Sequence, residues 1–267
     1  MASSDSFPLM AVDVGNSRVK LGEFDCRATE GLPFPLRALA LGLDWTDHDV
    51  AAFLPRGPAG YSWSIASVNR PAASRLIDWL KAREVPRVRV LSYADFPVTV
   101  DLARPDLVGL DRLANVVAVN RLRAANRPAL VIGFGSAVTV NLISETGALV
   151  GGAILPGVAM SARALHDFTD LLPLVEVAEP PLPLGTSTVG AVSSGLYWGM
   201  VGAVRELAAR LTAGRSALQV FLTGGAASIF SSALAELADG SPQYVPHLTL
   251  GGIAIASCGD GSPKGSR

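Results

Sequence analysis

Near the start of the chain stands Ala11-Val-Asp-Val-Gly-Asn-Ser-Arg-Val-Lys-Leu-Gly-Glu-Phe24. An apolar run ends at Asp13, and after the turn at Gly15 apolar and polar residues alternate, as on a strand half buried against a core. We therefore predict a hairpin with a glycine tip. Gly15 lets a ligand approach the backbone, short polar side chains follow it, and Asp13 is placed to hold a hydrated Mg²⁺. Alone, the pattern also fits an ordinary hairpin without a ligand, because short motifs are weak evidence.

The composition favours a folded protein that acts on small molecules. Hydrophobic residues make up 49% of the 267 residues and charged residues 17%, which excludes disorder throughout. The 22 basic residues nearly balance the 23 acidic ones, and no segment concentrates Lys and Arg as a nucleic-acid or membrane-surface site would. No apolar run reaches the roughly 20 residues of a membrane span. The start lacks a signal peptide's basic region, and Cys26 and Cys258 have no metal or redox spacing, so we expect a reduced, cytoplasmic protein.

Strand-like and helix-like segments alternate, which argues for an α/β fold, and a weak internal repeat divides it. Leu130–Ile143 repeats the opening pattern of apolar strand, Gly135-Ser136 turn and alternating strand, and Gly135 lies 120 residues after Gly15. Two similar halves would offer two phosphate clamps facing a central cleft; the alternative is a chance likeness of two glycine hairpins. We expect a boundary near residues 112–128, with domains at 1–112 and 113–258 and a disordered tail at 259–267.

A third motif, Gly109-Leu-Asp-Arg112, opens a predicted helix. Asp111 could take the proton from an attacking hydroxyl, since phosphoryl transfer needs mostly positioning and charge stabilisation with late proton loss. Arg112 could hold an anionic group of the substrate, because its planar fork donates two parallel hydrogen bonds. The structural alternative is that Asp111 caps the helix and that Arg112 is a solvated surface residue.

Several motifs in this order resemble the type III pantothenate kinase family, from about residue 9 to about residue 256. They are Asp13–Ser17, Gly109–Arg112, Gly135–Thr139, Gly151–Gly157 and Leu184–Gly195, and Leu222–Gly225 resembles the superfamily's adenosine-side turn. The resemblance implies two ribonuclease-H-like domains with a central cleft, as in the actin–hexokinase–chaperone ATPase superfamily. It also implies a homodimer that uses ATP and Mg²⁺ to phosphorylate pantothenate to 4'-phosphopantothenate, the first step of coenzyme A biosynthesis.

The resemblance assigns roles residue by residue. Asp111 matches the general base, and Asp13 matches the residue that holds Mg²⁺ through water. The ATP-binding positions correspond to Asp13, Val14, Gly15, Asn16, Ser17, Arg18, Val19, Lys20, Ser136, Gly224 and Gly225. The pantothenate-binding positions correspond to Gly109, Leu110, Asp111, Arg112 and Thr188.

Two positions depart from the family pattern. Gly133 stands where the family has an Asp that binds an activating monovalent cation, K⁺ or NH₄⁺, and the internal repeat also leads one to expect an acid there, opposite Asp13. Leu102 stands where the family often has a Tyr that lines the substrate pocket. These departures leave open a catalytically impaired relative that binds nucleotide or pantothenate as a regulatory protein. A sugar kinase of the same superfamily is a third interpretation.

Overall fold

The computed structural model describes residues 8–25, 31–213, 218–237 and 241–258, so Cys26 and the tail expected at 259–267 lie outside it. The described residues form an α/β fold with two five-stranded mixed sheets, which confirms the predicted fold class. Two compact units divide the chain: one holds the residues up to Leu122 and from His247 onward, and the other holds Arg123–Pro246. Within the described ranges, no helix combines the length and the apolar character needed to cross a membrane.

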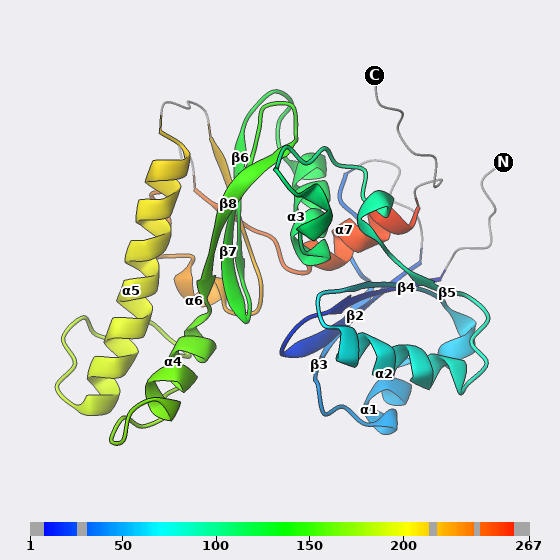
Figure 1. Cartoon of the computed structure of the whole chain (residues 1–267), viewed down its shortest axis with the longest axis horizontal. Coiled ribbons are helices and arrows are strands. Elements are labelled where there is room, and N and C mark those ends of the chain that lie inside the picture. The colour runs from blue at the N-terminus through cyan, green and yellow to red at the C-terminus, as the bar shows by residue number, and fades with distance from the viewer. Residues whose placement is uncertain (1–7, 26–30, 214–217, 238–240, 259–267) are drawn as a thin grey trace. The chain divides into compact units, whose positions relative to one another are not determined.

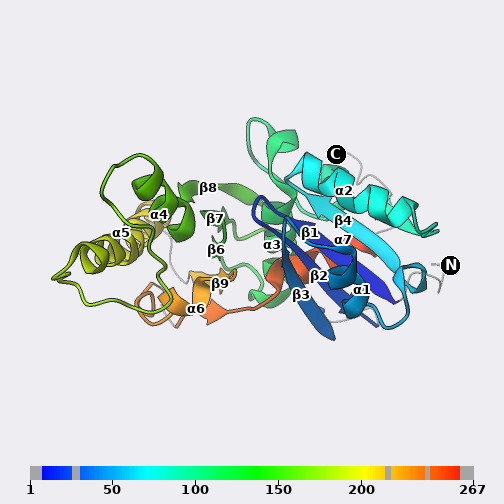
Figure 2. The same cartoon turned by 90° about the horizontal axis from the view of Figure 1, so that it is seen from below.

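The first unit is built on the sheet β3-β2-β1-β4-β5. The predicted hairpin is its centre, because β1 pairs antiparallel with β2 and parallel with β4. Helices α1 and α2 pack on one face of this sheet and α7 lies on the other (Figures 1 and 2). The elements are β1 (Leu9–Val14), β2 (Arg18–Phe24), β3 (Arg37–Gly42), α1 (Asp47–Phe53), β4 (Ser62–Ser67), α2 (Arg70–Lys81), β5 (Val88–Val90), α3 (Leu110–Leu122) and α7 (Leu248–Ser257).

Helix α7 packs against α3 and the first sheet, although the sequence-based domain boundary had grouped both helices with the second half. A Cβ added at Gly252 would lie 1.9 Å from the carbonyl oxygen of Ala114, so glycine permits this close crossing of the two helices. Beside the crossing, the buried Thr249 hydroxyl donates a hydrogen bond to Asn115 (2.8 Å). Long-range packing of this kind leaves no periodic signal in the sequence, because α7 is buried along almost its whole length.

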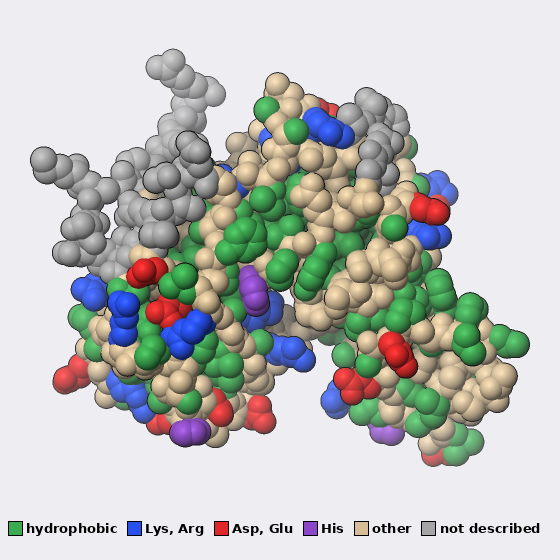
Figure 3. Space-filling view, turned by 180° about the vertical axis from the view of Figure 1, so that it is seen from behind, with side chains coloured by type: hydrophobic (Ala, Val, Ile, Leu, Met, Phe, Trp, Pro, Cys, Tyr) green, Lys and Arg blue, Asp and Glu red, His purple; other side chains and the backbone are tan. Residues whose placement is uncertain are grey.

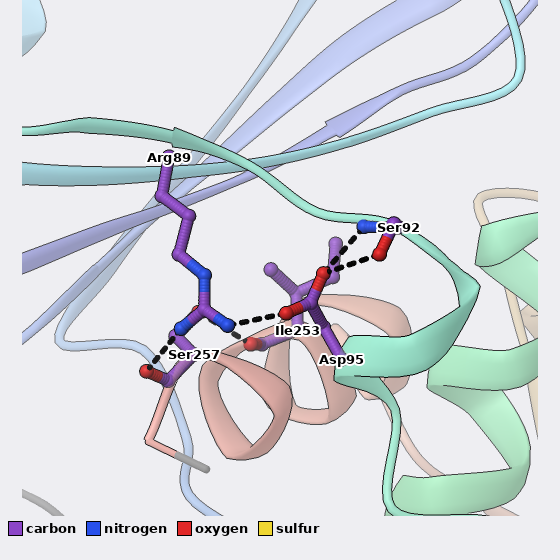
Figure 4. Close-up of polar contacts among 5 residues, drawn as sticks. All are labelled: Arg89, Ser92, Asp95, Ile253 and Ser257. Carbon is purple, nitrogen blue, oxygen red and sulfur yellow. Dashed lines mark hydrogen bonds and ion pairs between the residues drawn. The ribbon is translucent and has the colours of Figure 1, made fainter. Parts of the chain in front are cut away.

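The end of α7 is held by a polar network from β5 and the segment that follows it (Figure 4). The guanidinium of Arg89 donates to the carbonyl oxygen of Ser257 (3.4 Å) and forms an ion pair with Asp95. The backbone N–H and hydroxyl of Ser92 also donate to Asp95, at 2.6 and 2.8 Å. Burial would raise the pKa of Asp95, but the hydrogen bonds from Ser92 and Arg89 outweigh it and hold that pKa below its usual value.

The second unit is built on the sheet β10-β9-β6-β7-β8, which repeats the strand order and the parallel and antiparallel pairings of the first. The weak repeat in the sequence therefore corresponds to a repeat in topology. Helices α5 and α6 cover one face of the sheet through a core that includes Phe134, Val140 and Tyr197. The elements are β6 (Ala129–Phe134), β7 (Ala137–Ile143), β8 (Leu149–Pro156), α4 (Val158–Asp167), α5 (Thr188–Leu211), β9 (Gln219–Thr223), α6 (Ala227–Phe230) and β10 (Gln243–Tyr244).

An exposed apolar surface covers α4, the start of α5 and the segment between them. Hydrophobic side chains are visible in this region, at the lower right of Figure 3. Phe168 and Leu171 are 87% and 85% exposed, and the other members are Met160, Leu174, Leu182, Leu184, Val189 and Trp198. We call these residues the α4–α5 apolar surface. So many exposed large apolar side chains in one region are typical of a binding surface.

Candidate active site

Asp13 lies at the end of the central strand β1, where it is 4% exposed. It stands directly opposite Lys20 of β2, and the Lys20 Nζ lies 2.9 Å from its Oδ2. A buried carboxylate needs such a partner, because burial without one would cost several kcal/mol. The register of the predicted hairpin therefore places the carboxylate and its cationic partner directly opposite each other.

Asp111 lies in the first turn of α3, half buried, where its charge interacts with Asp13 and Lys20. Burial raises the pKa of Asp111, and the negative charge of Asp13 raises it further. The backbone N–H of Arg112 and the charge of Lys20 oppose the rise. Burial and Asp13 therefore increase the proton affinity of the Asp111 carboxylate while nearby Lys20 limits the increase, a combination typical of a general base.

Gly109 fixes where the Asp111 carboxylate lies. A Cβ at residue 109 would come within 2.5 Å of Asp111 Oδ1 and 3.3 Å of Val68 Cγ1. The carboxylate thus occupies the space that any larger residue at this position would fill.

Arg112 is half buried, and burial lowers the pKa of its guanidinium while the charge of Asp111 opposes that effect. This environment differs from the fully solvated surface position considered as the alternative. A guanidinium removed in part from water binds an anionic group more strongly than an exposed one does.

The hairpin tip beside this cluster exposes Asn16, Ser17 and Arg18, and the Gly15 N–H donates to the Arg18 carbonyl (2.9 Å). The end of β4 runs alongside it: the Val68 N–H donates to the Val14 carbonyl (3.0 Å). The sequence analysis did not include this second segment. The sequence does mark the end of this segment, because Asn69 followed by Pro71 is typical of the start of a helix. In the structure, Asn69 caps α2 by accepting from the Ala72 N–H (3.1 Å).

The predicted ATP positions of the second unit converge on the tip of its own hairpin. The carbonyl oxygen of Ser136 accepts from the Gly157 N–H (2.9 Å) just before α4. Gly224 has a φ of +101°, and a Cβ there would lie 2.3 Å from the Phe134 carbonyl oxygen, so this turn requires glycine. Gly225 follows it and is exposed.

Thr188 is the first residue of α5, where Ser187 caps the helix by accepting from the Gly190 N–H (3.1 Å). Thr188 is exposed and lines a groove of about 900 Å³ that also contacts Leu165 and Leu172. Of the two departures from the family pattern, Leu102 is half buried in the first unit and Gly133 lies in β6 of the second.

Solved structures of other proteins share the overall fold of this chain. The chain resembles in fold, and only in fold, the PilM–PilN type IV pilus biogenesis complex (TM-score 0.55, 10% identity, 95% of this chain and 99% of that one). It also resembles a putative 2-dehydro-3-deoxygalactonokinase from Sinorhizobium meliloti (TM-score 0.55, 14% identity, 94% and 97%). These similarities show a shared fold, in this chain an α/β fold with two repeated five-stranded mixed sheets.

Sequence comparison defines the family. The model of the family "Type III pantothenate kinase" matches residues 9–210. Type III pantothenate kinase of Endomicrobium trichonymphae is 30% identical over 257 residues, 92% of this chain and 97% of that one. The enzyme of Dinoroseobacter shibae is 40% identical over 158 residues, but the alignment spans only 59% of either chain. The type III pantothenate kinase of Acidiphilium cryptum is 34% identical, and its alignment spans 63% of this chain and 62% of the relative. The chain belongs to the type III pantothenate kinase family.

Proposed function

We propose that this chain transfers the γ-phosphoryl group of ATP to the primary hydroxyl of pantothenate, giving 4'-phosphopantothenate in the first step of coenzyme A biosynthesis. The observation that carries the proposal is the half-buried Asp111 carboxylate, which interacts electrostatically with the Asp13–Lys20 pair. A kinase site needs a base for the alcohol and charged groups beside the phosphates. Such an enzyme of primary metabolism is expected in the cytoplasm.

Asp111 accepts the proton of the attacking hydroxyl in this mechanism. Burial and Asp13 raise its pKa, which increases its affinity for that proton, while Lys20 favours the charged form that can accept it. Arg112 binds the carboxylate of pantothenate through its planar guanidinium, and Gly109 and Leu110 form the turn against which this substrate lies. Thr188 is proposed as a further pantothenate contact.

The residues of the first unit fit Mg²⁺. Asp13 offers a buried carboxylate, and Mg²⁺ in kinases is commonly held by one or two carboxylates together with water and phosphate oxygens. When bound, Mg²⁺ neutralises charge on the phosphates. We assign the phosphate contacts to the hairpin from Asp13 to Lys20 and to Ser136, and the adenosine-side contacts to Gly224 and Gly225.

A turnover assay tests the proposal. Purified protein with ATP, Mg²⁺ and pantothenate should release ADP and yield a product heavier by one phosphoryl group in mass spectrometry. Asp111→Asn should lower kcat by about 10²–10⁴-fold. Asp106→Asn is the matched control, because Asp106 lies in the same segment but is exposed and paired with Arg104 (2.7 Å). Nucleotide binding in calorimetry without transfer would indicate a regulatory binding protein instead, and turnover only with sugars would indicate a sugar kinase.

We also propose that the α4–α5 apolar surface forms a homodimer. A second copy would cover the exposed side chains of Phe168 and Leu171, and burial of apolar area drives association. Sedimentation should give a dimer for the wild type and a monomer for Leu171→Asp. Leu107→Asp, at an equally exposed leucine of the first unit (70% exposed), should remain dimeric. A wild-type monomer at micromolar concentration would contradict this assignment.

A further inference from the structure

The two hairpins place different residues at the same position of the repeated sheet. In the first unit, Asp13 lies between Lys20 and Ala66 on the neighbouring strands. In the second, Gly133 lies between Thr139 and Thr223. Directly opposed residues share a face of the sheet, so each set forms one row across three strands.

The row at Gly133 faces away from the core that α5 and α6 cover. The alternate residues Ile132, Phe134, Val138, Val140 and Leu222 fill that core, so residues 133, 139 and 223 point to the other face. Thr223 is 3% exposed, and Thr139 is half buried. The row is therefore formed by a glycine and two neutral hydroxyls in a largely buried setting.

The second sheet offers no carboxylate to a cation. None of its strands, β6 to β10 as described, carries Asp or Glu, whereas the first sheet carries Asp13 and Glu23. Strand β6 pairs on both sides, so its backbone carbonyls near Gly133 are engaged in the ladder. In the described residues, no group of three or more His, Cys, Asp or Glu side chains is arranged to hold a metal ion.

We infer that the second hairpin binds no monovalent cation and that phosphoryl transfer by this chain, if it follows the function proposed above, does not depend on K⁺ or NH₄⁺. A cation that leaves water for a buried site must regain its hydration energy from its ligands, and a carboxylate supplies a full negative charge for this purpose. Two hydroxyls carry no net charge. The residues at Gly133 therefore do not fit the cation that the family resemblance implies.

Two measurements test the inference separately from the proposed function. The first is the thermal unfolding temperature in KCl, NH₄Cl and choline chloride at equal ionic strength, which requires no turnover. A bound cation would raise the unfolding temperature in a concentration-dependent way. We expect identical curves, and saturable stabilisation by K⁺ or NH₄⁺ over choline would overturn the inference.

The second measurement is kcat in the same three salts. We expect less than a threefold difference, and a larger activation by K⁺ or NH₄⁺ would overturn the inference. Absence of turnover in all three salts would refute the proposed kinase activity, while the unfolding curves would still decide on the cation.

Restoring the carboxylate provides the converse test. Gly133 has no left-handed φ, so its backbone accepts a side chain. Gly133→Asp should acquire saturable stabilisation by K⁺, and Gly133→Asn, of equal size but neutral, should not. An unresponsive, folded Gly133→Asp variant would show that residue 133 is not the cause. If neither variant folds, the wild-type unfolding curves still decide the inference.

Discussion

Replacing Gly109 by alanine tests whether the position of the Asp111 carboxylate controls the rate of phosphoryl transfer. The new Cβ would lie 2.5 Å from Asp111 Oδ1, and ordinary contact begins at 3.4 Å, so the carboxylate must move by about 0.9 Å. Val68 Cγ1, at 3.3 Å from the Cβ, limits retreat of the alanine itself. A displacement of about 1 Å at a reacting group can cost about 10²-fold in rate, which corresponds to about 2.7 kcal/mol of activation free energy.

Steady-state kinetics with ATP, Mg²⁺ and pantothenate provide the assay. We expect kcat to fall about 10²-fold while the unfolding temperature changes little, because the clash is with the end of a side chain rather than with the backbone or the hydrophobic core. Gly42→Ala is the matched control: its Cβ would meet the carboxylate of Asp44, also two residues further on, at an exposed strand end. If Gly109→Ala keeps kcat within twofold of the wild type, the exact place of Asp111 does not limit the reaction and the reasoning fails.

Three further predictions follow from the charges. Lys20→Met removes a charge that lowers the pKa of Asp111, so the acid limb of the pH profile of kcat/KM should move to higher pH; an unmoved limb would exclude this coupling. Asp95→Asn should destabilise the protein by about 1–2 kcal/mol at neutral pH in urea unfolding. Because the folded-state pKa of Asp95 is depressed, its stabilisation is present above the unfolded pKa and is lost as pH falls through the folded pKa, so the difference should vanish in acid. For Asp111 the folded-state pKa is raised, so its effect on stability has the opposite pH dependence. The stabilisation that Asp111 contributes is fully present below its unfolded-state pKa and is lost as pH rises through its folded-state pKa. At neutral pH, Asp111→Asn should therefore unfold at a higher temperature than the wild type.

Local patterns accounted for both hairpins and for the repeat. The alternation after Gly15 and after Gly135 follows from one buried face per strand, and the structure has β1–β2 and β6–β7 where the pattern placed them. The position of α7 was not predictable in this way. Its contact with α3 joins Gly252 to Ala114 across more than half of the chain, and only tertiary packing determines such a partner.

In the candidate site, too, local motifs indicate the residue types but not the environment that surrounds them. The motif around Asp111 indicated a base, but the raised pKa arises from burial and from Asp13, which lies on a different element. Likewise, the sequence marked Lys20 as part of a phosphate loop, and its ion pair with Asp13 became evident only from the strand register. Residue types are encoded locally, whereas the electrostatic environment depends on which strand ends meet.

The two repeated sheets illustrate how one topology supports different chemistry. In the first, the carboxylates of Asp13 and Asp111 interact with each other and with the cations Lys20 and Arg112, and burial together with the charge of Asp13 raises the proton affinity of Asp111. In the second, the equivalent row is neutral, and under the proposed function a phosphate bound beside it would meet no repulsion from this row. Only the row of the first unit carries an acid, and the proposed function places proton transfer and Mg²⁺ binding there. Under the proposed function the two repeats have different roles, so the absence of an acid at Gly133 does not by itself indicate a lost activity.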